Sequence, residues 1–308
     1  MQELFNSCQR LILDNYKGSI DDVSLEVMTI AVMALMLRDE KRTLEHLPHL
    51  LQKIEVFAEK DSVVNIAKRH IDTFNDETVV DNIGACVIRG FGKDDETGEV
   101  YEDKCLVVST INFDDNPSDI IMKVTHELTH LLRDKKFIAD GNSISMKNGI
   151  SVVRVKDIST GEKTTKHFYF EEGIVQRYTN QALDLLHEFI SNEDLIEGSL
   201  LDVFRNDYKE KVRSAYDLQV QIVDTLCRDE KFDEAVDASF DEDIQPSRLA
   251  VYYNNKMNDS TAFTSLSKDV DRCFIELAAG SKDATERYYR SALGKVAEFL
   301  KRGKVKRQ

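Results

Sequence analysis

The chain has 308 residues, which is long enough to bury a substantial core without metal or disulfide cross-links. Its 42% apolar and 31% charged residues are typical of a globular protein and exclude a disordered one. With 41 basic and 56 acidic residues the formal net charge is −15, so we expect neither nucleic acid nor an anionic membrane as a partner.

Three further features favour a cytoplasmic protein that is neither exported nor embedded in a membrane. The first ten residues contain no basic region followed by an apolar stretch, so we expect no secretory signal. The longest uncharged apolar run, residues 27–37, is too short to span a bilayer. The cysteines are scattered, with no C-x-x-C pair, which favours reduced thiols. They are Cys8, Cys86, Cys105, Cys227 and Cys273.

The N-terminal quarter of the chain has a helical pattern. Asp21 and Asp22 can cap a helix over residues 23–38, which is apolar on most sides and is therefore expected to be packed all round. Pro48 lies in an expected short break. Residues 50–70 then return to helical spacing.

A β-hairpin and another helix are expected next. Residues 79–91 and 105–113 are rich in strand-forming residues and flank a polar, glycine-containing turn at 93–99, a pattern that predicts a hairpin. Asn116 is a good N-cap, and proline is tolerated at the first helical position. These residues predict a helix over 117–134, with apolar residues at helical spacing.

Residues 141–170 are expected to form a three-stranded meander between helices. Asn148 and Gly149 separate two alternating runs, and an Asn-Gly pair in this position is a strong signal for a tight hairpin turn. A second turn at 159–162 precedes the third expected strand. From about residue 170 to residue 300 the pattern is helical almost throughout.

The helix expected over 117–134 contains the pattern H-E-x-x-H. Residues four apart project from one face of a helix, so His126 and His130 can reach one metal ion. Glu127 is offset by about 100° around the helix and can reach a water molecule on that metal. This arrangement is typical of a zinc hydrolase, in which the carboxylate takes a proton as the water attacks a polarised carbonyl. Two ordinary helix histidines are the alternative, which the uncharged flanking residues disfavour.

A zinc site of this kind needs a third protein ligand. Arg133 and Lys136 occupy the positions where a glycine and a third histidine would mark the metzincin type, so that type is excluded. The other route is a carboxylate from the next helical segment, which begins with F-E-E-G at 170–173. Adjacent helical residues diverge by about 100°, so Glu171 and Glu172 cannot both face the same ion.

With these residues, segments 117–134 and 141–190 resemble the gluzincin family of zinc metallopeptidases. In that family the third ligand is a glutamate just before a small residue, which matches Glu172 before Gly173. Carried over residue by residue, the resemblance implies one Zn²⁺ ion held by His126, His130 and Glu172, with Glu127 as the catalytic base.

The chain departs from the thermolysin-like pattern at Gln176, where the family has an aspartate that orients one histidine. The resemblance also implies that the strand at 105–113 pairs with extended substrate backbone, although an ordinary interior strand fits its residues equally well. A tyrosine or histidine from the C-terminal helices usually stabilises the oxyanion in such enzymes. The candidates here are Tyr178, His187, Tyr216, Tyr252 and Tyr253.

The sequence thus predicts an α+β protein with a zincin-like catalytic core, in which a small antiparallel or mixed sheet accompanies the active-site helices. Residues 1–75 are expected to form a helical N-terminal region, 76–190 the zinc-binding core and 191–308 a helical C-terminal subdomain. The predicted function is a cytoplasmic zinc metallopeptidase acting on a peptide or protein substrate. The alternatives are a catalytically degenerate zinc-binding regulatory protein, against which the intact Glu127 argues, and a protease selective for one target protein.

Overall fold

The structure is a computed structural model with a helix-rich α+β fold. It describes residues 1–52, 85–93, 100–109, 116–133, 135–140, 143–157, 162–211, 216–241 and 247–302. The helices are α1 (Gln2–Asn15), α2 (Asp22–Leu51), α5 (Pro117–Leu131), α6 (Phe168–Ile190), α7 (Leu200–Lys211), α8 (Asp217–Leu226), α9 (Glu230–Ala238), α10 (Arg248–Met257), α11 (Ala262–Ala278) and α12 (Lys282–Arg302). None of these helices is long and apolar enough to cross a membrane. The predicted α+β class is confirmed at this level.

The described residues group into two compact units, each built from separate stretches of chain. The first unit contains Met1–Leu132 and Tyr178–Arg213, and the second contains Arg133–Arg177 and Ser214–Gln308. The three consecutive regions expected from the sequence stay a prediction, because compactness does not show which parts fold on their own.

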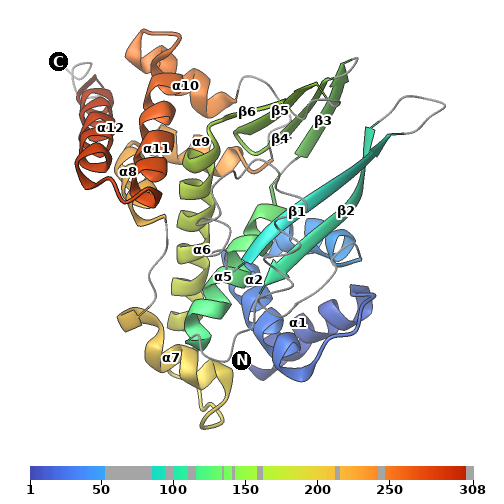
Figure 1. The fold of residues 1–308 in the computed structure, drawn as a ribbon. Helices are drawn as coiled ribbons and strands as arrows, with labels where there is room; N and C mark the ends of the chain where they lie inside the picture. The colour runs from blue at the N-terminus through green and yellow to red at the C-terminus, as the bar shows by residue number, and fades with distance from the viewer. Residues whose placement is uncertain are drawn as a thin grey trace. The chain divides into compact units, whose positions relative to one another are not determined.

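The first unit is built around α2. The side chain of Asp21 accepts a hydrogen bond from the backbone N–H of Ser24 at 2.9 Å and so caps α2, as predicted. Residues 27–35 are all buried, which agrees with a helix that is packed on every side. Helix α2 contacts α1 and α5, and α5 also contacts α7 and the two-stranded β1–β2 ribbon (Figure 1).

The break expected at Pro48 is wrong, because α2 continues through this residue to Leu51. The helix bends at Asp39 instead, where φ is −158° and ψ is 86°. The Asp39 carboxylate accepts a hydrogen bond from the backbone N–H of Arg42 at 3.0 Å, so it caps the second part of the helix. The helical continuation expected over residues 50–70 lies, from residue 53 onward, outside the described residues.

The first sheet confirms the predicted hairpin. Strands β1 (Ala85–Lys93) and β2 (Val100–Ser109) pair antiparallel, with a bulge between Gly90 and Phe91. The turn that joins them, residues 94–99, lies outside the described residues. Both strands contact α5, so the ribbon lies beside the helix that carries the H-E-x-x-H pattern.

The second sheet has four antiparallel strands, one more than the expected meander. Its order is β3 (Lys135–Asp140), β4 (Ser143–Asn148), β5 (Ser151–Asp157) and β6 (Glu162–Lys166). The sequence pattern does not reveal β3, because this strand begins only four residues after α5 ends and carries two leading lysines. The predicted hairpin is present, but its turn residues are Gly149 and Ile150, one position later than the expected Asn148 and Gly149, and Gly149 adopts a positive φ of 55°.

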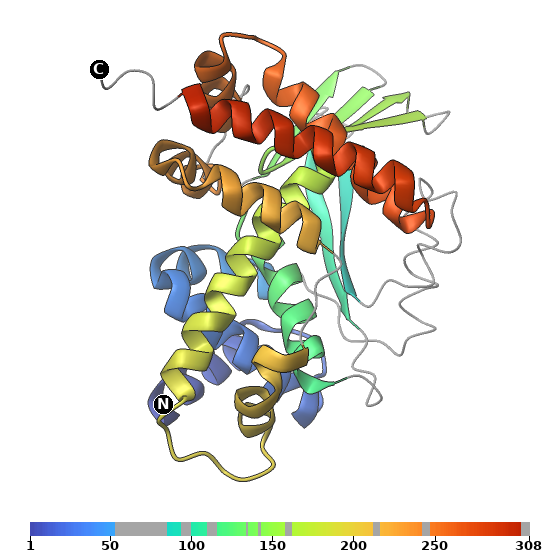
Figure 2. The same ribbon diagram turned by 90° about the vertical axis from the view of Figure 1, so that its left-hand side faces the viewer.

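The helices of the second unit pack through aromatic and charged contacts. Helices α11 and α12 lie against each other (Figure 2), and α10 contacts α9, α11 and α12. The ring of Tyr253 stacks on that of Phe299, with 4.7 Å between centroids. Asp229 caps α9 by accepting from the backbone N–H of Phe232, and it also pairs with Lys256 at 2.5 Å. These contacts tie α9, α10 and α12 together.

The first turn of α6 is anchored by α11. The backbone N–H of Tyr169 donates to Asp271 at 3.0 Å, and the Tyr169 ring stacks on Phe274 at 4.1 Å. Burial raises the pKa of Asp271 to about 6, and this effect outweighs the opposing effect of the backbone hydrogen bonds. His167, just before α6, lies against the Phe263 ring, in agreement with the packing role expected of a histidine without a motif.

We predict that Asp271→Asn removes a pH dependence of stability. The pKa of this carboxyl is 3.8 ordinarily and about 6 in the folded protein, so stability falls as pH rises through this window, by about 3 kcal/mol. Asparagine stays neutral and still accepts from Tyr169. Urea unfolding should show equal stabilities near pH 4 and a more stable variant at pH 7.5. The same difference at both pH values would contradict the prediction.

Candidate metal centre

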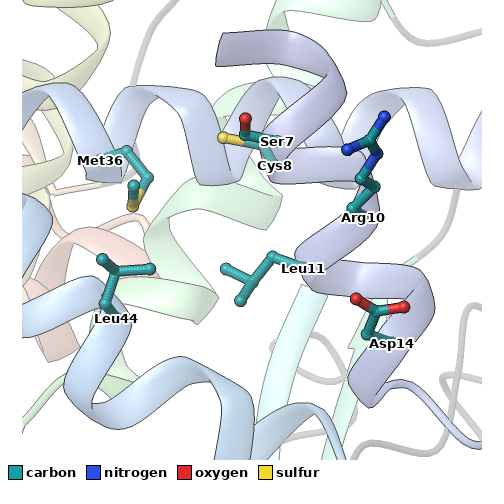
Figure 3. A pocket seen from close by; sticks show the side chains of 7 residues that line it. All are labelled: Ser7, Cys8, Arg10, Leu11, Asp14, Met36 and Leu44. Atoms are coloured by element: carbon teal, nitrogen blue, oxygen red, sulfur yellow. The ribbon is translucent and has the colours of Figure 1, made fainter. Parts of the chain in front are cut away.

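A hollow of about 300 Å³ in the first unit, between α1 and α2, is not the candidate site. Figure 3 shows the side chains that line it: Ser7, Cys8, Arg10, Leu11, Asp14, Met36 and Leu44. None of the residues singled out by the sequence pattern is among them. The residues of the H-E-x-x-H pattern lie instead along α5.

Helix α5 begins as predicted and is buried along the segment that carries the motif. The Asn116 side chain accepts a hydrogen bond from the backbone N–H of Ser118 at 2.9 Å, and Pro117 is the first helical residue. The helix ends at Leu131, three residues earlier than expected. Every residue over 124–133 is buried, so the polar side chains in this stretch require partners inside the protein.

Two threonines hold the motif helix against α6. The Thr129 hydroxyl donates to the backbone carbonyl of Thr125 at 2.8 Å and lies 3.2 Å from the hydroxyl of Thr179 in α6. This contact involves the residue next to His130. Glu172 precedes Thr179 by seven residues, which is about two helical turns, so both project from the same face of α6.

The structure brings His126, His130 and Glu172 together. One potential ligand atom from each residue lies within 4.8 Å of the other two. The Nε2 atoms of the two histidines are 3.1 Å apart. Two nitrogens bound to one tetrahedral zinc ion would be about 3.3 Å apart, so the observed spacing fits two corners of such a site. A hydrogen bond between two neutral imidazoles has a similar length. Such a bond gives no reason for the carboxylate of Glu172 to lie beside both rings.

The residues of the motif keep a narrow access to solvent. The exposed fraction is 5% for His126, 9% for Glu127, 8% for His130 and 6% for Glu172. The other residues over 124–131 are at most 1% exposed. The surface that stays open on this part of α5 therefore belongs to the residues that the motif singles out. A catalytic zinc site needs such an opening, because one coordination position is left for water or substrate.

The donor set fits a zinc ion. Two imidazole nitrogens and one carboxylate oxygen form one of the ligand sets of catalytic zinc. The same set also suits ferrous iron, and metal analysis distinguishes the two. Glu127 is not part of the ligand group, although it is adjacent to His126 on α5. A carboxylate beside the ligands, rather than among them, is the arrangement of a hydrolytic site.

Glu171, the neighbour of Glu172, has a different partner. Its Oε1 pairs with Nε of Arg133 at 2.7 Å, and its Oε2 accepts from Nη2 of Arg133 at 2.8 Å and from the backbone N–H of Ile150 at 3.1 Å. The side chains of Arg133 and Glu171 are 0% and 2% exposed. The ion-pair contact and the two hydrogen bonds together engage both oxygens of Glu171, which supports Glu172 as the ligand.

Sequence reasoning missed the role of Arg133, which served there only to exclude the metzincin type. The available signal was its position directly after the apolar residues Leu131 and Leu132, because an arginine that is buried with them needs an acid beside its charge. The acid that the second helix offers in addition to the expected ligand is Glu171.

Gly173 has a packing reason to follow Glu172. A Cβ atom at this position would lie 2.8 Å from Cβ of Gln219 in α8, and 3.1 Å from the backbone carbon and oxygen of the same residue. Such distances are too short for carbon atoms in contact. Helix α8 therefore passes directly against α6 at Gly173, where a larger residue does not fit without a shift of Gln219.

Three of the five candidates for the oxyanion donor use their polar atoms in other contacts. The Tyr252 hydroxyl donates to Asp229 at 2.7 Å. The Tyr253 hydroxyl donates to the backbone carbonyl of Lys295 at 3.3 Å. Nε2 of His187 lies 3.0 Å from a backbone carbonyl of α7. The Tyr178 ring lies 4.8 Å from the guanidinium of Arg38, and the Tyr216 ring stacks on Phe274 at 5.5 Å. The oxyanion donor stays a prediction among these residues.

No protein-family model, curated protein or solved structure matches the chain. The resemblance to gluzincins therefore depends on the motif residues and on the geometry that the structure gives them.

We predict that Gly173→Ala destabilises the protein by about 1–3 kcal/mol, because the added methyl group overlaps Gln219. Gly294→Ala is the matched control, since this helical glycine of α12 has open space around its Cβ position. The control should gain up to about 1 kcal/mol from higher helix propensity. Urea unfolding of both variants measures the difference, and equal effects would show that the contact with α8 is not tight.

Proposed function

We propose that the protein is a zinc-dependent metallopeptidase with a zincin-like, gluzincin-type core, which hydrolyses peptide bonds in a peptide or protein substrate. The observation that carries the proposal is the buried group of His126, His130 and Glu172, whose ligand atoms lie within 4.8 Å of one another. Glu127, which is adjacent to His126 on α5 and lies outside the ligand group, favours hydrolysis over a purely structural metal site.

The residues of the chain divide the work of peptide hydrolysis. When bound, zinc polarises a carbonyl group and makes a water molecule more acidic. Glu127 accepts the proton of the attacking water and then delivers it to the leaving amine. Its side chain is largely buried but still 9% exposed, which suits a base that must meet substrate in a site with little bulk water.

The β1–β2 ribbon offers a way to hold the substrate. Among the described strands, β2 pairs with β1 on one edge, and both contact α5. An extended peptide that adds to the other edge of β2 gains backbone hydrogen bonds and runs beside the motif helix. Residues 105–109 of the expected substrate strand belong to β2, and residues 110–113 lie outside the described residues.

A zinc-binding regulatory protein without catalysis is the second candidate. It requires the three ligands but gives Glu127 no task. Zinc content together with turnover of unstructured peptides separates the two, since zinc without any turnover favours the regulatory protein.

We predict that Glu127→Gln keeps the zinc ion and loses hydrolysis. The amide cannot accept the proton, so turnover of a mixture of unstructured peptides should fall at least about 100-fold. Metal analysis of the purified variant should still give one zinc ion per chain. Glu188→Gln, on the exposed part of α6, is the control and should retain full activity. Full hydrolysis by the Glu127 variant would show that another group is the base.

We predict that Glu172→Ala weakens zinc binding, because it removes a ligand. The loss of affinity should exceed the roughly 10- to 100-fold loss that is typical when a group that only supports a ligand is removed. Competition with a coloured chelator measures the affinity. Glu188→Ala removes a carboxylate from the same helix at an exposed position and should leave the affinity unchanged. If both variants bind zinc like the wild-type protein, Glu172 is not a ligand.

A further inference from the structure

Arg133 and Glu171 form a fully buried ion pair. Both residues lie close to the proposed metal ligands in the sequence, and neither belongs to the ligand group. Arg133 comes three residues after His130, just beyond the end of α5, and Glu171 directly precedes Glu172 in the first turn of α6. The guanidinium and the carboxylate meet through an ion-pair contact between Nε and Oε1 at 2.7 Å and a hydrogen bond from Nη2 to Oε2 at 2.8 Å. The pair therefore joins the chain segments that follow and precede two of the ligands.

Further contacts fix the orientation of both charged groups. The remaining guanidinium nitrogen, Nη1 of Arg133, donates to the Ser239 hydroxyl at 3.1 Å, and the guanidinium lies 4.0 Å from the centre of the Phe240 ring. The backbone N–H of Ile150 donates to Glu171 at 3.1 Å. A planar fork with this many partners has one orientation, unlike an ammonium group on a flexible chain.

Stability alone does not explain such a pair. The cost of removing two charges from water largely offsets their attraction, and apolar residues of similar volume are often as stable. What such a pair provides in addition is direction, because the hydrogen bond from Nη2 and the ion-pair contact of Nε together engage both carboxylate oxygens only over a narrow range of mutual orientations. The start of α6, where Glu171 directly precedes Glu172, is thereby held in a fixed orientation to the segment at Arg133.

We infer that Arg133 is a positioning residue of the metal site, which acts through Glu171 to aim the Glu172 carboxylate at the ion bound by His126 and His130. This inference rests on the proposed function, because it requires that these residues bind zinc. It goes beyond the proposal because it makes the zinc affinity of the site depend on Arg133, a residue outside the ligand group.

The test is the zinc affinity of Arg133→Lys, which keeps the positive charge but loses the fork. Affinity is measured by competition with a coloured chelator at a low temperature at which all variants are folded. We expect zinc to bind about 10-fold more weakly, as is typical when a group that supports a ligand is altered. A loss of overall stability does not change the affinity of molecules that remain folded, so a merely structural role predicts wild-type affinity.

Lys295→Met is the matched control. Lys295 pairs with Asp269 at 2.7 Å in the same unit, away from the ligands in the sequence. This variant should lose stability in urea unfolding while its zinc affinity stays that of the wild-type protein. An equal loss of affinity in both variants would overturn the inference, because it would then reflect general loosening.

A double variant covers the case in which Arg133→Lys does not fold. Arg133→Met with Glu171→Leu removes both charges of the pair, so neither is left buried without its partner, and the variant should fold and still bind zinc about 10-fold more weakly than the wild-type protein. Wild-type affinity in either folded variant overturns the inference and leaves the proposed function standing. Absence of zinc binding by the wild-type protein overturns both.

Discussion

A helix that is buried on every side can carry ionisable side chains only where the protein or a ligand holds them. Residues 124–133 meet this condition, and their polar groups are of two kinds. Some are satisfied by fixed neighbours, such as Thr129 by the α6 hydroxyl and Arg133 by Glu171. The two histidines instead converge with Glu172 at a point that keeps some access to solvent. The polar groups along α5 thus divide into those with a structural partner and those that belong to the proposed metal site.

Two adjacent glutamates have opposite roles because a helix turns by about 100° per residue. Glu171 pairs with the guanidinium of Arg133, so its charge is balanced within the fold. Glu172 faces two imidazoles, which are neutral whenever they ligate a metal. Of the three groups it is then the one that carries negative charge toward a divalent ion. A difference of one position in the sequence decides whether a buried carboxylate supports the fold or the proposed chemistry.

The sequence predicted the features that local rules govern. Helix α5 with its Asn116 cap, the β1–β2 hairpin and the tight turn at Gly149 follow from capping, alternation and turn chemistry over a few residues. The spacing of the two histidines on one helix is local in the same sense.

The features that the sequence did not predict depend on contacts between distant residues or on sequence signals that are less obvious than a proline. Arg133 and Glu171 are 38 residues apart, and the reason for Gly173 is a helix that passes over it from residue 219. The bend of α2 at Asp39 arises from a capping aspartate within an otherwise helical pattern, and the proline nearby is the more obvious signal. Short β3 lacks the alternation that identifies a strand.

The turn between β4 and β5 shows how the ion pair constrains a position that lies outside both helices. Gly149 has a left-handed backbone, which asparagine also tolerates. A side chain of any kind at this position would, however, overlap the guanidinium of Arg133 and the carboxylate of Glu171. The requirement for glycine is therefore set by the Arg133–Glu171 ion pair as well as by the hairpin. A homologous chain that retains both charges should retain this glycine, and one that loses them is free to vary here only as far as the turn allows.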